Sequence, residues 1–364
     1  MQELKVNLGE RSYPIFIGAG NLNSCGEYIK RQCRGGSNKV LLTVDKNVNA
    51  LYAETVHDSL ERAGLEVSKK VISPGEKSKS LAAASEFYDL LLDQGFERSS
   101  AVIGLGGGVV GDLSGFVAAT YMRGIDFVLI PTSLLAQVDS SIGGKVAVNH
   151  ERAKNIIGAF YQPEIVYMDM EVLRTLPDRE FRSGLAEIIK HGLGFDADFF
   201  RYLGEHREDI LSLKPGVLSE VIRRSCQIKK EIVQRDEKEE NVRARLNLGH
   251  TIGHALEAAD SYSTFNHGEA VAVGMVAEAM LSAAEGMMAG DNVAELKDLL
   301  EKYHLPVRIP AEFSMDELIE LMKNDKKSRD GRVEFALPAD TGKTLICRDW
   351  DSKNLRAVLE ELSG

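Results

Sequence analysis

Three histidines lie close together in the second half of the chain, where they could bind a metal ion. His250 and His254 are four residues apart, so a helix over this segment would place them on one face. His267 falls within the same stretch of eighteen residues, in a chain that holds eight histidines. Catalytic zinc ions are typically held by three protein ligands, with one position left for substrate or water. The cluster therefore predicts a metal site, but its spacing does not decide which two histidines bind.

A carboxylate ligand for the same ion is available in the segment 184–191. Glu187 lies there among apolar neighbours on a predicted helix, and a buried carboxylate is seldom left without a partner. From the residues alone, ligation is no better supported than an ion pair with Lys190 or a place on a polar helix face. The segment 250–254 lacks the glutamate of the HExxH motif, which argues against a metalloprotease.

A glycine loop in the first half is suited to binding a dinucleotide. Gly106, Gly108 and Gly111 fit the pattern G-x-G-x-x-G, after a predicted strand and before a helix-compatible stretch. Without a Cβ atom, the backbone can approach a pyrophosphate closely and present its N–H groups at the start of a helix. The pattern alone is weak, because glycine clusters also form tight turns. It also comes later in the chain than in a standard Rossmann unit, so we expect a sheet that is connected differently.

Two other segments are candidates for the same ligand. Asp45 and Asn47 end an earlier predicted strand and would hydrogen-bond the ribose. The segment 75–79 follows the next strand at the equivalent edge, although a solvated turn is its simpler interpretation.

The run from Ile130 to Lys145 is rich in serine, threonine and glycine and ends in a cation, which suits phosphate and amide contacts. The net charge of −11 argues against a binder of nucleic acid or of anionic membranes, since both need a positive field over one face. A local group of cations must therefore bind any anionic ligand. The candidates in the middle third are Lys145, Lys154, Lys190, Lys229 and Arg243.

These residues must be positioned by a sheet in the first half of the chain. Short β-branched runs alternate there with stretches of helical spacing, which predicts a mainly parallel, Rossmann-like sheet with ligands beyond the carboxyl ends of its strands. We expect strands at 39–44, 66–72, 100–105, 126–132 and 164–169, and helices at 49–63 and 80–94.

The pattern becomes helical after the segment 170–177, with strand-like runs only at 333–338 and 344–348. A chain of 364 residues exceeds the usual size of one core. We expect an α/β dinucleotide-binding domain over 1–172 and a mainly α-helical domain over 173–364 that carries the metal and substrate sites. We also expect a substantial interface between them that contains the active site.

The composition predicts a soluble cytoplasmic protein. The N-terminus has no basic segment followed by an apolar one, and no window approaches the roughly 18 unbroken apolar residues of a membrane span. The four cysteines are scattered and have no CxxC spacing, as expected of reduced thiols.

Four motifs, taken together with the run from Ile130 to Lys145, resemble one known family. GGGVVGD (106–112), AEIIKHG (186–192), NLGHTIGHALE (247–257) and NHGEAVAVGM (266–275) are similar to motifs of the 3-dehydroquinate synthase family of sugar phosphate cyclases. The resemblance extends over nearly the whole chain. It implies conversion of 3-deoxy-D-arabino-heptulosonate 7-phosphate to 3-dehydroquinate and phosphate, a step of the shikimate pathway of aromatic amino acid biosynthesis. In this family the substrate is transiently oxidised by NAD, loses phosphate, is reduced again, opens its ring and closes by an aldol reaction.

The resemblance also implies the cofactor contacts. Zinc, or cobalt in its place, would be bound by Glu187, His250 and His267, which leaves His254 to act on the substrate. NAD would contact residues of the predicted strand ends and the glycine loop, namely Asp45, Asn47, Gly75, Glu76, Lys79, Gly107, Gly108, Val109, Asp112, Thr132, Ser133, Lys145 and Lys154.

The substrate contacts follow in the same way. The phosphate would be held by Lys145, Asn155, Lys190 and His254, with Arg123 donated by the other subunit of a homodimer. The remaining pocket residues would be Asp139, Lys229, Glu239, Arg243, Asn247 and a lysine of the segment 325–327, assigned here to Lys326. Pro74 departs from the family pattern, in which an aspartate precedes Gly-Glu, so a side-chain contact there is in doubt.

Three other functions were weighed against this one. A sister cyclase would act on sedoheptulose 7-phosphate, but Lys229, Arg243 and the pair Lys326–Lys327 suit a substrate that carries a carboxylate. A metal-dependent polyol dehydrogenase would consume its cofactor and form NADH. A nucleotide-binding regulatory module would explain the glycine loop but not the histidines beside a group of lysines.

Overall fold

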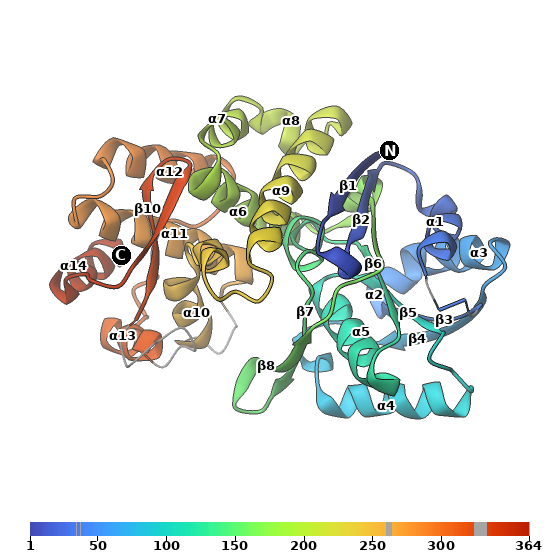
Figure 1. The fold of residues 1–364 in the computed structure, drawn as a ribbon. Coiled ribbons are helices and arrows are strands. Elements are labelled where there is room, and N and C mark those ends of the chain that lie inside the picture. The colour runs from blue at the N-terminus through green and yellow to red at the C-terminus, as the bar shows by residue number, and fades with distance from the viewer. Residues whose placement is uncertain (34, 37, 260–263, 324–332, 364) are drawn as a thin grey trace. The chain divides into compact units, whose positions relative to one another are not determined.

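The computed structural model describes residues 1–33, 35–36, 38–259, 264–323 and 333–363. It forms two compact units, Met1–Leu176 and Pro177–Gly364 (Figure 1). The first is built on a mainly parallel sheet and the second is mainly helical, so the predicted fold class is confirmed.

The first unit contains a seven-stranded sheet in the order β1-β2-β9-β6-β5-β3-β4. Only β1 and β2 pair in antiparallel fashion, and every other neighbouring pair is parallel. The five predicted strands are confirmed to within two residues. The strands are β1 (Gln2–Val6), β2 (Tyr13–Gly18), β3 (Lys39–Asp45), β4 (Glu66–Ile72), β5 (Ala101–Gly106), β6 (Asp126–Pro131) and β9 (Ile165–Asp169).

The central strands are apolar throughout because helices cover both faces of the sheet. All residues of β5 and β9 are buried, whereas the residues of the edge strand β4 are exposed or half-buried up to Ile72, which is buried. Helices α4 and α5 lie on one side of the strands and α1 and α3 on the other (Figure 1). The helices are α1 (Cys25–Gln32), α2 (Lys46–Val48), η3 (Asn49–Ala53), α3 (Glu54–Arg62), α4 (Leu81–Asp93) and α5 (Gly108–Thr120).

Two features of this unit were not predicted. The first is the antiparallel pair β1–β2, whose Pro14 precedes the ladder with β9 and pairs only with β1. The second is the hairpin of β7 (Lys145–His150) and β8 (Ala153–Phe160), in a stretch expected only to bind anions. Six short 3-10 or π segments complete the unit, namely η1 (Gly9–Arg11), η2 (Leu22–Ser24), η4 (Glu76–Ser78), η5 (Tyr121–Arg123), η6 (Ala136–Ser140) and η7 (Met170–Thr175).

The second unit packs around one apolar helix, α11 (His267–Ala284), which is buried on nearly all sides. A helix that is apolar all round can only be a core helix, and α11 contacts α6, α10, α12, α14 and β10. The other elements are α6 (Asp178–Phe195), α7 (Ala197–Glu205), α8 (Arg207–Leu211), α9 (Pro215–Arg235), η8 (Val242–Asn247), α10 (His250–Ala259), α12 (Gly290–Lys302), α13 (Met315–Lys323), β10 (Phe335–Asp340), β11 (Lys343–Cys347) and α14 (Ser352–Leu362).

Small residues let α11 approach its neighbours closely. A Cβ atom on Gly274 would lie 2.0 Å from the carbonyl oxygen of Gly249, and one on Gly268 would lie 2.2 Å from that of Ser183. Both distances are far below van der Waals contact. The glycines of α11 therefore set how near the ends of α6 and α10 come to this helix.

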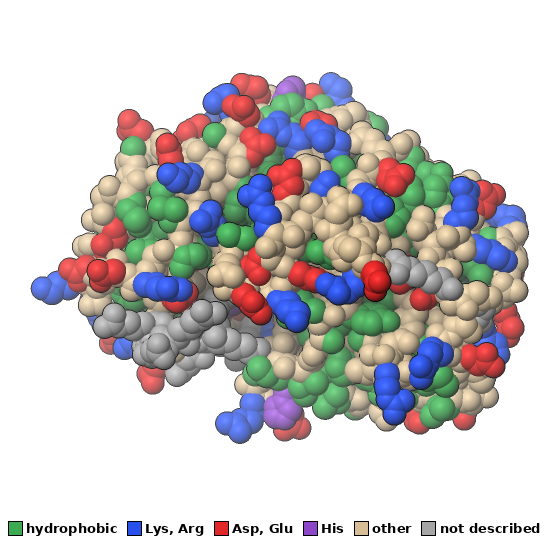
Figure 2. All heavy atoms as spheres, in the orientation of Figure 1, with side chains coloured by type: hydrophobic (Ala, Val, Ile, Leu, Met, Phe, Trp, Pro, Cys, Tyr) green, Lys and Arg blue, Asp and Glu red, His purple; other side chains and the backbone are tan. Residues whose placement is uncertain are grey.

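The surface is mixed in charge. On the face shown in Figure 2, the basic side chains of the described residues are interspersed with acidic ones and do not gather into one patch. This face lacks the extended positive field that nucleic-acid binding requires. Among the described residues, no helix combines the length and the apolar character needed to cross a lipid bilayer.

Candidate functional site

Glu187 is the most deeply buried carboxylate of the predicted site. It lies on α6, where its side chain is fully buried, so the alternative of a polar helix face is wrong. Neither carboxylate oxygen accepts a hydrogen bond from the described residues. A buried carboxylate in this state requires positive charge close by.

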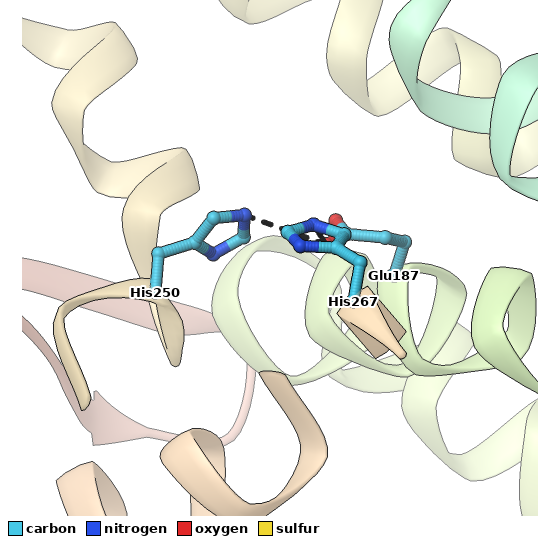
Figure 3. Close-up of side chains that lie close together, drawn as sticks. All are labelled: Glu187, His250 and His267. Atoms are coloured by element: carbon cyan, nitrogen blue, oxygen red, sulfur yellow. Dashed lines mark ion pairs between the residues drawn. The ribbon is translucent and has the colours of Figure 1, made fainter. Parts of the chain in front are cut away.

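Three side chains bring nitrogen atoms close to this carboxylate, and Figure 3 shows two of them, His250 and His267. The Nε2 atoms of His250 and His267 each lie 3.5 Å from Oε1 of Glu187. The ammonium group of Lys190 forms an ion pair with Oε2. Ligation and the ion pair with Lys190, which the sequence left as alternatives, are thus compatible in one arrangement.

The geometry of these groups fits a divalent cation. One oxygen of Glu187 and one nitrogen of each of His250 and His267 all lie within 4.8 Å of one another. In a tetrahedral zinc site with bonds of about 2.1 Å, ligand atoms lie roughly 3.4 Å apart, close to the distances observed here. His254 lies on the same helix as His250, with its ring centre 6.3 Å from that of His267, and does not belong to this group. The structure therefore brings all three rings together, with centre-to-centre distances of 5.3 to 6.3 Å, and the group of converging ligand atoms contains Glu187, His250 and His267.

Each imidazole is oriented by a contact on its far side. The Nδ1 atom of His250 lies 3.1 Å from the carbonyl oxygen of Leu248, and that of His267 lies 3.4 Å from Oε2 of Glu257. Both contacts favour a proton on Nδ1, which leaves the Nε2 lone pair directed at the centre of the site. Glu257 is a site residue that the sequence analysis missed, although it lies on the same face of α10 as His250, seven residues later.

The buried charges of Glu187 and His267 shift each other's pKa values. Burial alone would raise the pKa of Glu187, but the opposing charges of Lys190 and His267 hold this pKa well below its ordinary value. Burial alone would lower the pKa of His267, yet the carboxylates of Glu187 and Glu257 raise it to about 10. A divalent cation at this place would displace the proton of His267, so acid should weaken metal binding.

Three of the predicted substrate contacts in the second unit are buried cations. Lys190, Lys229 on α9 and Arg243 on η8 are 1%, 6% and 2% exposed, respectively. Such residues are almost never buried without an anionic or polar partner. The group is therefore chemically suited to an anionic ligand.

Asp236 organises the turn that carries Arg243. Its carboxylate accepts the backbone N–H groups of Glu240, Asn241 and Arg243 at 2.9, 2.7 and 2.9 Å. Burial would raise the pKa of Asp236, but these three N–H groups lower it below its ordinary value. Asp236 could not be selected from the sequence, because its role depends on a turn that propensities do not specify.

Backbone strain coincides with several predicted site residues. Six described non-glycine residues have a positive φ angle, and three of them, Arg123, Asn155 and Glu239, belong to the predicted site. Glu239 also accepts a hydrogen bond of 3.0 Å from the Nδ2 atom of Asn247. Such conformations cost about 1–3 kcal/mol and cluster at functional sites, which supports the choice of these residues.

The glycine loop of the first unit joins β5 to α5, as predicted. The strand ends at Gly106, Gly107 is the N-cap, and the helix begins at Gly108. A Cβ atom on Gly106 would come within 2.6 Å of Val110, so packing requires this glycine. On Gly107 or Gly108 it would meet nothing closer than a serine hydroxyl at 3.4 Å. The backbone of these two residues is therefore left open for a ligand, beside a small pocket that Asp112, Ser140 and Lys145 help to line.

The interpretation of the segment 75–79 as a solvated turn is wrong for Lys79. Its side chain is 4% exposed and forms an ion pair with Asp112, and its ammonium group donates to Oδ1 of Asn155. Glu76 accepts a hydrogen bond of 2.8 Å from Nδ2 of Asn149. The structure thus brings Lys79, Asp112 and Asn155 together, while Gly75 stays exposed.

The other predicted contacts of the first unit occupy varied places. Asp45 ends β3 and caps α2 by accepting the N–H groups of Asn47 and Val48. Thr132 is buried, and its N–H donates to the carbonyl of Gly106. Pro74, Asn47, Arg123 and Lys145 are exposed, whereas Val109, Ser133, Asp139 and Lys154 are half-buried. Lys326 and Lys327 lie outside the described residues.

Comparison with known proteins agrees with the geometry. Residues 69–183 match the family model for the N-terminal part of 3-dehydroquinate synthase, and residues 184–328 match that for its C-terminal part. The chain is 47% identical to the 3-dehydroquinate synthase of Desulforamulus reducens over 361 residues, which cover 99% of this chain and 100% of that protein. It is 48% identical to that of Caldanaerobacter subterraneus over 346 residues, which cover 95% and 96% of the two chains.

Solved structures of sugar phosphate cyclases are similar along the whole chain. One is the 2-epi-5-epi-valiolone synthase of Streptomyces hygroscopicus with NAD+ and Zn2+ bound, with a TM-score of 0.88, 28% identity and 98% of each chain covered. Another is a 2-deoxy-scyllo-inosose synthase complexed with carbaglucose-6-phosphate, NAD+ and Co2+, with a TM-score of 0.89, 25% identity and 99% and 100% of the chains covered. A probable glycerol dehydrogenase of Sinorhizobium meliloti, 15% identical with a TM-score of 0.66 and 96% of each chain covered, shares the fold alone. On the full-length identity of 47% and the two matching family models, the chain belongs to the 3-dehydroquinate synthase family.

Proposed function

We propose that this chain converts 3-deoxy-D-arabino-heptulosonate 7-phosphate into 3-dehydroquinate and inorganic phosphate, with NAD and a divalent cation as bound cofactors. Membership of the family supports the reaction. The observation that carries the proposal is the fully buried Glu187, which two imidazole Nε2 atoms approach to 3.5 Å. A buried group of this composition is costly unless it binds a cation.

Glu187, His250 and His267 would hold the cation, and their oxygen and nitrogen donors suit zinc or cobalt. When bound, the cation would supply a Lewis acid for a substrate oxygen and NAD would supply an acceptor and donor of hydride. The ion pair of Lys190 with Glu187 would keep this lysine beside the ligands.

The buried cations of the second unit would bind the substrate's anionic groups. Lys190 and His254 would hold the phosphate, and Lys190 would stabilise the charge that develops as the carbon–oxygen bond to phosphate breaks. Lys229 and Arg243 would hold the substrate carboxylate. Asn247, Glu239 and Lys326 are proposed to orient the substrate's hydroxyl groups.

The first unit would bind NAD at the glycine loop. The N–H groups at the start of α5 would face the pyrophosphate, and Asp45 and Asn47 would contact a ribose. The other NAD contacts proposed are Gly75, Glu76, Lys79, Gly107, Gly108, Val109, Asp112, Thr132, Ser133, Lys145 and Lys154. By family resemblance, we also propose that Lys145, Asn155, Asp139 and Arg123 act on the substrate, and that the protein works as a homodimer in the cytoplasm.

The test is a measurement of inorganic phosphate released from the heptulosonate, with sedoheptulose 7-phosphate as the matched substrate that lacks the carboxylate. We expect turnover of the heptulosonate only, with 3-dehydroquinate as the product and no accumulation of NADH at its absorbance band. Preference for sedoheptulose 7-phosphate would mean that the chain is a sister cyclase. Net NADH formation would mean that it is a dehydrogenase.

A second measurement addresses the metal. Dialysis against a chelator should remove phosphate release, and zinc or cobalt should restore it. Full turnover by protein that contains less than one metal ion per hundred chains would contradict the metal's proposed role.

A further inference from the structure

Two buried glutamates outside the proposed ligand set lie on the helices that carry the two histidines. Glu257 is on α10, the helix that begins with His250, and Glu278 is on α11, the helix that begins with His267. Glu257 is 9% exposed and Glu278 is fully buried. Burying a carboxylate is expensive, so the contacts of these two residues need an explanation.

Glu257 acts on the histidine of the other helix directly. Its Oε2 atom lies 3.4 Å from Nδ1 of His267, on the side of the ring opposite to the Nε2 atom that faces Glu187. A carboxylate in this position fixes the orientation of the ring and keeps the Nε2 lone pair available.

Glu278 acts on the other histidine through one peptide group. Its Oε2 atom accepts the N–H of Gly249 at 2.6 Å. The carbonyl of the same peptide group, that of Leu248, lies 3.1 Å from Nδ1 of His250. Because a peptide group is planar, fixing its N–H also fixes the carbonyl that orients His250.

The backbone of this turn has little freedom to move. Gly249 has a φ angle of +80°, and its carbonyl oxygen would lie 2.0 Å from a Cβ atom on Gly274 of α11. The turn is thus in contact with α11, and the acceptor that the described residues provide for the Gly249 N–H is the side chain of Glu278. A charged acceptor gives a shorter and stronger hydrogen bond than a neutral one.

We propose that Glu257 and Glu278 are positioning residues that brace the two imidazole ligands reciprocally. Each of α10 and α11 supplies one histidine and the carboxylate that orients the histidine of the other helix. The brace fixes both Nε2 atoms at the distance from Glu187 that a tetrahedral ion needs. This inference rests on the proposed metal-binding role of Glu187, His250 and His267.

The test compares zinc affinity with stability in the full-length protein. Zinc affinity is measured by competition with a chromogenic chelator, and the melting temperature is measured on metal-free protein. The variants are Glu257→Gln and Glu278→Gln, which keep the shape of the side chain. The control is Ser282→Ala, one turn beyond Glu278 on α11, which removes the buried hydrogen bond of 2.5 Å to the carbonyl of Pro338.

We expect Glu257→Gln to weaken zinc binding by roughly 10- to 100-fold, the usual effect of losing a carboxylate behind a histidine ligand. Glu278 acts on His250 through a peptide group, so Glu278→Gln should weaken zinc binding by about tenfold. Both should change the visible absorption spectrum of the cobalt-substituted protein, which reports the geometry of the ligands. Ser282→Ala should lower the melting temperature but leave zinc affinity and the cobalt spectrum unchanged.

The outcomes separate the two proposals. If the unaltered protein does not bind zinc, the proposed metal site is wrong, whatever the variants do. If it does bind zinc but folded Glu257→Gln binds equally well with an unchanged cobalt spectrum, the reciprocal brace is wrong. Glu257→Gln alone decides this point if Glu278→Gln does not fold. Loss of stability in Glu278→Gln without loss of zinc affinity would make Glu278 a structural residue only and would equally overturn the brace.

Discussion

The glycine loop of the first unit and the proposed metal centre of the second are built from different kinds of atoms. The loop presents backbone groups of consecutive residues, from Gly106 to Asp112, where β5 gives way to α5. The metal centre gathers side chains from three helices, α6, α10 and α11. A site made of backbone follows from a local sequence pattern. A site made of distant side chains follows only from how helices pack, and it needs further residues to orient its ligands.

Glycines show the same difference. In the loop, a Cβ atom on Gly108 would lie 3.4 Å from the hydroxyl oxygen of Ser140 and 3.8 Å from its Cβ atom, which is ordinary contact, so packing does not require a glycine there. In the second unit, a Cβ atom on Gly274 would lie 2.0 Å from a backbone oxygen, so the space serves helix packing. One glycine should therefore matter for binding and the other for stability.

The largest effect is expected from His250→Ala, which removes a proposed ligand. Phosphate release should fall by about three orders of magnitude, because Lewis-acid stabilisation is worth several kcal/mol. Metal analysis should find no retained zinc. NAD affinity, measured by fluorescence, should change little because the glycine loop belongs to the other unit. Full activity in metal-free variant protein would exclude the assignment.

Lys190→Ala is expected to rank second. The loss of a buried charged partner should weaken binding of a phosphorylated substrate analogue by about 10- to 100-fold. Calorimetry should find NAD affinity nearly unchanged. Normal affinity for the analogue together with lost NAD affinity would show that the proposed role of Lys190 is wrong.

A matched pair of glycine substitutions tests the comparison itself. Gly274→Ala should lower the free energy of unfolding by about 1–3 kcal/mol through overpacking. Gly108→Ala should leave this free energy within about 0.5 kcal/mol of the original but weaken NAD binding by about tenfold, an energy of about 1.4 kcal/mol. Urea unfolding and NAD titration of both variants provide the measurements. The distinction between the two glycines fails if both variants lose stability equally and bind NAD equally well.

The smallest effect on activity is expected from Asp236→Asn, which concerns the turn that carries Arg243. The folded-state pKa of Asp236 is lowered, so its contribution to stability is complete above the unfolded pKa and disappears as the pH falls through the folded one. At neutral pH the variant should be less stable by about 1–2 kcal/mol. The difference should shrink below about pH 4, as urea unfolding at several pH values would show. A difference that is constant with pH would mean that the charge of Asp236 is not what stabilises the turn.

The sequence predicted those elements whose patterns are local. Strands β3 and β4 were placed at their observed positions because each is a short β-branched run bounded by turn residues. The pair β1–β2 was not predicted because proline is unusual in a strand. Pro14 is tolerated here because it precedes the ladder with β9. The hairpin β7–β8 was not predicted because the segment before β7 is rich in glycine and serine, which indicate loops.

The sequence predicted which residue types make up the candidate site, but not how they are arranged in space. The glycine loop lies where the pattern placed it, between a strand and a helix. Glu187 and the three histidines were also predicted as candidates. Their spacing did not show which histidines bind the metal, or whether Glu187 is a ligand or forms an ion pair. The sequence did not identify Glu257, Glu278 or Asp236, since an acidic residue in a helix or turn usually faces solvent.

The sequence by itself determined the glycine loop and which imidazole, carboxylate and ammonium groups the chain contains. Both depend only on the identity and order of the residues. Only the tertiary structure decided that His250 and His267 face Glu187 while His254 does not belong to the group. It also placed Glu257 behind the ring of His267 and Glu278 against the peptide group that contacts His250. The physical reason is that these distances depend on how closely α10 approaches α11, and small residues far apart in the sequence set that approach.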